Sequence, residues 1–175
     1  MGETVTAGAR GAQGFSLVET MIALGILAVI AAGVLPLGLL ATNTTENQGH
    51  LMARCTEYAQ DKAEQLFALA WGDVTSDTRV FPATTTGGTG LAIGGTTNTA
   101  APVAGYVDYL DVNGNVLASA GGAPATWFYA RAWAIASPRG NLKQITVRTT
   151  VRAAALGGAG RVPESTVSVL KTFPF

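Results

Sequence analysis

The N-terminal quarter of the chain is dominated by one long apolar run. Phe15–Leu40 covers about 26 residues and would extend about 39 Å as a helix. Because the hydrocarbon core of a bilayer is about 30 Å thick, a tilted helix of this length would span it. No charged side chain occurs from Thr20 to Thr45, but a carboxylate, Glu19, lies at the start of the run. A charge in apolar surroundings is costly unless something pairs with it, so Glu19 needs an explanation.

From Asn47 to Trp71 the apolar residues recur with the period of an amphipathic helix. The apolar positions are Leu51, Cys55, Tyr58, Ala59, Leu66 and Leu69. The charged positions on the opposite side are Arg54, Glu57, Asp61 and Glu64. We therefore predict one helix from Phe15 to about Ala70, ended by the glycine of Trp71-Gly72-Asp73, with its second half packed on a sheet. Two helices hinged at Thr42–Thr45 are the alternative.

The C-terminal half of the chain has the alternation and the turn residues of β-structure. Thr84–Pro102 is rich in Gly and Thr, which predicts a long surface loop with a short strand at Leu91–Ile93. Tyr106–Ser119 predicts a hairpin that turns at Asn113-Gly114, since both residues tolerate positive φ.

Three further strands are predicted at Thr126–Ile135, Lys143–Arg152 and Ser165–Phe173, with a turn at Ser137–Asn141 between the first two. The second of them alternates with period two, which indicates one buried face. The residues on that face are Ile145, Val147, Thr149 and Val151. A long helix followed by antiparallel strands predicts an α+β fold.

Composition excludes several classes of protein. The formal net charge is zero and the basic residues are scattered, so specific nucleic-acid binding is not indicated. The only cysteine and the only histidine, Cys55 and His50, can form neither an intramolecular disulfide nor a zinc site. They lie five positions apart on a predicted helix and do not face each other. The sequence also lacks a phosphate-binding loop and hydrolase motifs, so we predict no enzyme and no cofactor.

One group of oxygen-bearing side chains is a weak calcium candidate. Asp108, Asp111, Asn113 and Asn115 lie close together around the predicted turn. Their pattern partly matches a calcium loop, but the glycine comes too early and no glutamate closes the site. An ordinary hairpin turn is the favoured interpretation.

Two simple interpretations of the N-terminal segment fit poorly. A cleaved secretory signal has a basic start and an apolar core of about 7–15 residues, whereas here Glu19 falls where the core should begin. A plain membrane anchor explains the length of the run but not Glu19. Its flanks also carry few basic residues to set an orientation.

The stretch GFSLVE, from Gly14 to Glu19, followed by an apolar run, resembles the prepilin signature of type IV pilins and their pseudopilin relatives. The resemblance covers about residues 11–40. It includes Pro36, which lies about 21 residues after Phe15, where many of these proteins carry a helix-bending proline. The leader departs from the common pattern in having little positive charge.

The resemblance implies a processing site and a pairing role. A prepilin peptidase would cut after Gly14, and the new terminus, Phe15, would be N-methylated. Glu19 would pair with the Phe15 amine of an adjacent subunit as that subunit leaves the membrane. Pro36 would kink the helix and help helices to pack.

The resemblance also implies an organisation and a location. Residues 1–14 would be a cleaved leader, 15–45 a transmembrane and filament-core helix, and 46–175 a periplasmic globular domain. The precursor would cross the bacterial inner membrane once, with its N-terminus in the cytoplasm, before it enters a filament. Its partners would be other pilins or pseudopilins, the prepilin peptidase and inner-membrane lipid, with no small-molecule substrate.

The predicted function is a minor pilin-like subunit of a type IV pilus, incorporated into the filament or priming its assembly. A single cysteine means that the chain has no C-terminal disulfide loop of the kind found in many major pilins, which favours a minor subunit. A pseudopilin of a type II secretion system is one alternative. A membrane-anchored periplasmic binding module, not cut at Gly14, is another from a different class.

Overall fold

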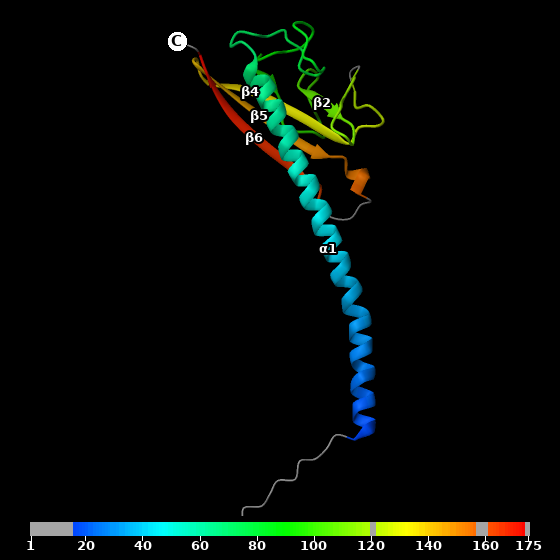
Figure 1. Ribbon diagram of the computed structural model, residues 1–175. Coiled ribbons are helices and arrows are strands. Elements are labelled where there is room, and N and C mark those ends of the chain that lie inside the picture. Colours follow the sequence, from blue (N-terminus) through cyan, green and yellow to red (C-terminus); the bar gives the residue numbers. More distant parts are fainter. Residues whose placement is uncertain (1–15, 120–121, 157–160, 174–175) are drawn as a thin grey trace, which may run out of the picture. The chain divides into compact units, whose positions relative to one another are not determined.

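The computed structural model describes residues 16–119, 122–156 and 161–173. Contacts divide the chain into two compact units, Met1–Thr45 and Glu46–Phe175, and each is described by itself. The described elements are one long helix, a six-stranded antiparallel sheet and a short 3-10 helix, η1 (Ala153–Leu156) (Figure 1). This is the predicted α+β fold, with a long N-terminal apolar helix and an antiparallel sheet.

The helix α1 (Leu17–Ala68) is continuous through the polar positions near residue 45. The Thr42 hydroxyl donates to the carbonyl of Gly38 at 3.0 Å, and the Thr45 hydroxyl donates to the carbonyl of Ala41 at 2.9 Å. Each hydroxyl is thus satisfied four residues back, within the helix itself. The structure therefore has the single predicted helix and not the hinged pair.

In the second unit, α1 buries the predicted apolar stripe. Cys55, Ala59 and Leu66 are fully buried, whereas the four charged positions predicted opposite them are exposed. One position departs from the prediction: Lys62 lies on the buried side and has no exposed surface.

The C-terminal end of α1 is capped by lysines and not by a glycine. The Lys171 ammonium donates to the carbonyls of Phe67 and Leu69, and the Lys143 ammonium donates to the carbonyl of Trp71 at 2.7 Å. The Phe67 carbonyl is in the last turn of α1, where no further turn supplies a donor, and the other two carbonyls lie just after the helix. A cation at this end also complements the helix dipole. The predicted stop at Gly72 is wrong, because Gly72 does not adopt positive φ and α1 ends at Ala68.

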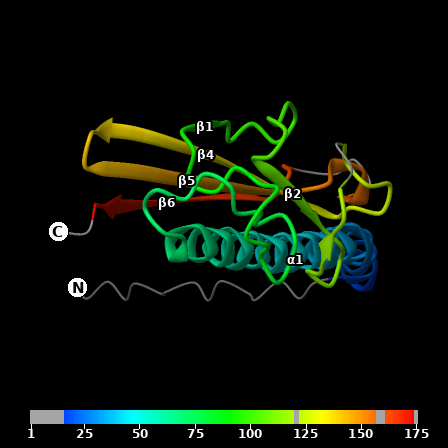
Figure 2. The same cartoon turned by 90° about the horizontal axis from the view of Figure 1, so that it is seen from above.

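The strands of the sheet, whose bounds are given below, follow the order β3-β2-β4-β5-β6. The short strand β1 stands outside this order and pairs with β4. Every pairing is antiparallel. Figure 2 shows the second half of α1 running alongside the sheet. The strands are β1 (Gly94–Gly95), β2 (Val107–Leu110), β3 (Val116–Leu117), β4 (Tyr129–Arg139), β5 (Leu142–Val151) and β6 (Glu164–Thr172).

The inner face of the sheet forms the main core with α1. Along β5, the predicted inward residues Ile145, Val147, Thr149 and Val151 are all buried. In β4, Trp133 and Ile135 pair with Val147 and Ile145 and join the same cluster as Leu66 of α1. The period-two pattern of the sequence is therefore confirmed.

The predicted hairpin forms, but with a wider turn than expected. Tyr109 pairs with Leu117 and Leu110 with Val116, which leaves a five-residue loop from Asp111 to Asn115. The turn therefore contains Asn113-Gly114 as predicted, but only Gly114 has positive φ, at 89°, and Asn113 does not. A Cβ at Gly114 would also lie 2.4 Å from the Tyr58 hydroxyl oxygen. Both the positive φ and this close approach therefore favour glycine at this position. The short strand predicted at Leu91–Ile93 is found at Gly94–Gly95 instead.

Candidate functional site

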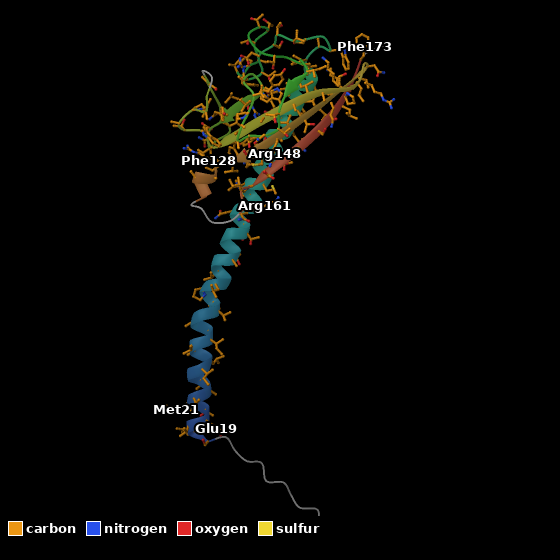
Figure 3. The ribbon with its side chains drawn as sticks, turned by 180° about the vertical axis from the view of Figure 1, so that it is seen from behind. Glu19, Met21, Phe128, Arg148, Arg161 and Phe173 are labelled. Atoms are coloured by element: carbon orange, nitrogen blue, oxygen red, sulfur yellow. The ribbon has the colours of Figure 1, made fainter. Side chains whose placement is uncertain are left out.

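The predicted processing site lies at the beginning of α1. Gly14 and Phe15 are outside the described residues. Glu19 occupies the first turn of α1 and is exposed, as Figure 3 shows. Pro36 lies within the same helix.

Glu19 forms a reciprocal pair of hydrogen bonds with Ser16. The backbone N–H of Ser16 donates to Oε2 of Glu19 at 3.3 Å, and the backbone N–H of Glu19 donates to the Ser16 hydroxyl oxygen at 3.2 Å. This arrangement is a capping box, in which two N–H groups at the start of a helix gain partners. The carboxylate also lies at the positive end of the helix dipole. Part of the cost of a charge beside the apolar run is therefore offset within the chain itself.

The capping box also orients the Glu19 carboxylate. Its Oε2 is bound to Ser16, whereas its Oε1 has no hydrogen bond to any residue that the structure describes. One oxygen thus remains able to accept from a donor on another molecule. Ser16 was not among the predicted site residues, although the serine three positions before a glutamate is a recognisable helix-start signal.

The first half of α1 presents an apolar surface on all sides. The segment Leu17–Leu39 has a mean hydropathy of 2.5 and is long and apolar enough to cross a membrane. None of this segment is buried within the chain. A helix that is apolar all round requires lipid or other helices as its surroundings.

Pro36 lies in this apolar part of α1 without ending it. A proline within a helix has no N–H to donate to the carbonyl four residues before it, and its ring crowds that carbonyl. The predicted kink is consistent with this chemistry and stays a prediction.

The second unit contains a buried cluster of charges that joins α1 to the sheet. The Asp108 carboxylate in β2 accepts a bidentate pair of hydrogen bonds from the Arg131 guanidinium in β4, at 2.7 and 2.8 Å. It also forms an ion pair with the Lys62 ammonium of α1 at 2.7 Å. All three side chains are at most 1% exposed. Asp61, which is half-exposed on α1, accepts from Arg131 at 2.9 Å and completes the balance of two cations and two anions.

Burial and charge act in opposite directions within this cluster. Burial lowers the pKa of Lys62 to about 8, against the attraction of Asp108. Burial would raise the pKa of Asp108, but Lys62 and Arg131 hold it below its ordinary value. The Lys62 ammonium also donates to the carbonyl of Thr78 and lies 4.4 Å from the centre of the Trp133 ring. The Thr78 carbonyl and the Trp133 ring therefore favour the charged form of Lys62, against the effect of burial.

The calcium candidate does not form one set of ligands. Asp108 faces the interior, where both of its oxygens are held by cations. The Asp111 carboxylate instead accepts from the backbone N–H groups of Asn113 and Asn115 and from the Asn115 amide, which stabilises the turn. Among the residues that the structure describes, no three acidic, histidine or cysteine side chains are grouped to hold a metal ion. The hairpin-turn interpretation is thus the one that the geometry supports.

Comparison with known proteins identifies one feature. Residues 9–35 match the model of the prokaryotic N-terminal methylation motif. Neither a curated protein nor a solved structure matches the chain. The motif and the apolar helix α1 together support a type IV pilin-like protein, as the sequence indicated. Processing of the prepilin type and association with other pilins follow from the motif in general terms.

Proposed function

We propose that the chain is a minor pilin-like subunit of a type IV pilus that enters the filament or primes its assembly. The main support is the match of residues 9–35 to the methylation motif. The apolar segment Leu17–Leu39 overlaps this motif, and none of it is buried within the chain. A prepilin peptidase would cut after Gly14, and Phe15 would become the methylated terminus. The role is structural and not enzymatic.

The proposed assembly step depends on Glu19. After cleavage, Phe15 would carry a charged amine beside the apolar run. Oε1 of Glu19, which has no partner among the described residues, would accept from the Phe15 amine of a neighbouring subunit while Ser16 retains Oε2. Breaking a charge pair in apolar surroundings costs several kcal/mol, so the neighbour in the correct register is favoured over others.

The same apolar surface would serve in two places. In the precursor, Leu17–Leu39 would lie in the inner membrane, with the N-terminus in the cytoplasm and Glu46–Phe175 in the periplasm. In the filament it would pack against the corresponding helices of other subunits. The buried ion pair of Lys62 with Asp108 would join the second half of α1 to the sheet.

Filament purification and gene deletion test this proposal together. Sheared surface filaments should contain the chain in a small amount, and deletion should reduce piliation without reducing protein secretion. Loss of secretion with normal piliation would instead identify a pseudopilin of a type II secretion system. A chain that stays in the membrane fraction and affects neither process would contradict the filament role and favour a periplasmic binding module.

A further inference from the structure

The strand β6 forms an open edge of the sheet. It is the last strand in the order β3-β2-β4-β5-β6, and among the residues that the structure describes it pairs with β5 alone (Figures 1 and 2). An open edge presents a row of backbone N–H and C=O groups that can pair with another strand.

The direction of these backbone groups can be assigned from two hydrogen bonds. The carbonyl of Pro163 accepts from Val151 at 3.1 Å, and the N–H of Phe173 donates to Asn141 at 3.0 Å, both toward β5. Because successive residues of a strand point their backbone groups to opposite sides, the even-numbered residues point to the open edge. Thr166, Ser168 and Leu170 therefore offer three N–H and three C=O groups there.

The middle of this edge lacks the usual protection against pairing. The register between β5 and β6 is unbroken from Leu142 to Thr150, so no bulge twists the edge away. The stretch from Ser165 to Leu170 contains neither a proline nor a charge; the two charged residues of β6, Glu164 and Lys171, lie near its ends. Natural proteins commonly place bulges, prolines or charged residues on an edge strand that must stay unpaired.

The core is also incomplete on this side of the sheet. On β5, Ile145 and Val147 are fully buried, but their cross-strand partners on β6, Val169 and Val167, are only partly buried. Next to Val169 lies an open groove of about 310 Å³ between α1 and β6. It is lined by Ala63, Glu64, Phe67, Ala68 and Val169. Phe67, which lines this groove, is 48% exposed.

We propose that the edge of β6 accepts one further strand from a partner protein. The two-residue repeat of the open backbone groups requires an extended segment, and the groove beside it requires apolar side chains at alternate positions of that segment. The occupant would therefore be a strand that continues the sheet and completes the core over α1. This surface lies wholly in the second unit, so the inference does not depend on processing at Gly14.

A matched pair of variants at Thr166 tests the proposal. Thr166 is exposed, and its hydroxyl makes no hydrogen bond to a described residue. Thr166→Pro removes one N–H from the open edge but none from the β5 side, whereas Thr166→Val keeps that N–H. The probe is a labelled nine-residue peptide of alternating valine and threonine between terminal lysines, titrated against the full chain in detergent.

We expect the native chain and Thr166→Val to bind the peptide within about twofold of each other, and Thr166→Pro to bind at least about tenfold more weakly. Amide exchange at Thr166, Ser168 and Leu170 should slow in the complex, whereas Val167 and Val169 should be protected already in the free chain. A folded Thr166→Pro variant is identified by unchanged protection of those two valine amides.

Three results would overturn the proposal. One is equal binding of a peptide that is N-methylated at every second residue, which would show docking in the groove without strand pairing. Another is the same protection of Thr166, Ser168 and Leu170 in a concentration-dependent dimer, which would make a second copy the occupant. The third is binding of the peptide with no protection of these amides.

Discussion

The members of the buried charge cluster differ in how much stability the protein loses when each is replaced. Asp108 is the one carboxylate between two buried cations, Lys62 and Arg131. In Asp108→Asn the shape of the side chain is kept but the two cations lose their shared counter-charge. Removing one partner of a buried ion pair costs about 3–5 kcal/mol. Removing Lys62 instead leaves the bidentate Arg131–Asp108 pair intact.

The distances allow an independent check of that magnitude. Each cation lies 2.7 Å from an oxygen of Asp108, so the two positive groups are roughly 5 Å apart. Two unit charges at that distance repel by about 3 kcal/mol at an effective dielectric constant of about 20. In the native chain the attraction of both cations to Asp108 offsets this repulsion, and Asp108→Asn removes that attraction. Asp108→Asn should therefore lower the free energy of unfolding by about 3–5 kcal/mol. Lys62→Met should lower it by less than about 1.5 kcal/mol, since a linear side chain of similar volume stays beside Trp133.

The assay is urea unfolding of the full chain in detergent, followed by tryptophan fluorescence. The slope with urea concentration should be the same for all variants, so that midpoints can be compared directly. Equal losses of unfolding free energy for Asp108→Asn and Lys62→Met would refute the argument that only Asp108→Asn leaves buried charges without a partner. So would a loss below about 1 kcal/mol for Asp108→Asn, which would mean that water or rearrangement replaces the missing charge.

Three other predictions concern the start of α1 and the titration of Lys62. Glu19→Ala should leave cleavage and membrane insertion unchanged but reduce the amount of chain in sheared filaments; an unchanged amount would show that Glu19 does not pair with a neighbour. Ser16→Ala should weaken the start of α1 by about 1 kcal/mol, seen as faster amide exchange in its first turn, whereas Ser16→Thr should restore protection. Because burial lowers the pKa of Lys62 to about 8 from its ordinary 10.5, the unfolded chain binds more protons between these values. The stability of the native chain relative to Lys62→Met should therefore rise with pH across this window, and a fall would contradict the burial of a charged Lys62.

The helix and the main strands could be predicted because one face of each is buried. The stripe through Cys55, Ala59 and Leu66 and the alternation through Ile145 and Val147 both follow from that burial. Turns and helix ends were less predictable because they depend on distant groups. Lys171, far along the chain, caps α1 where Gly72 was expected to, and Tyr58 restricts the turn at Gly114.

The charge cluster could not be assembled from the sequence, although each member left a trace. Lys62 falls on the apolar stripe seven positions after Cys55, and Asp108 and Arg131 each lie two positions before a buried apolar residue, Leu110 and Trp133, on the inner face of their strands. A charge on a buried face predicts a partner, but only the pairing of β2 with β4 shows which one. Asp108 and Asp111 do not form one site because Asp108 points inward from β2, whereas Asp111 follows the end of that strand and holds the turn.

The N-terminal residue of the mature chain tests the central claim most directly. The protein would be purified from membranes of cells with active prepilin peptidase, and its intact mass and N-terminal peptide would be measured by mass spectrometry. The account predicts a chain that begins at N-methylated Phe15, with residues 1–14 absent. A chain that retains Met1 in these cells, or one cut elsewhere, would contradict the assignment of Gly14, Phe15 and Glu19 to filament assembly.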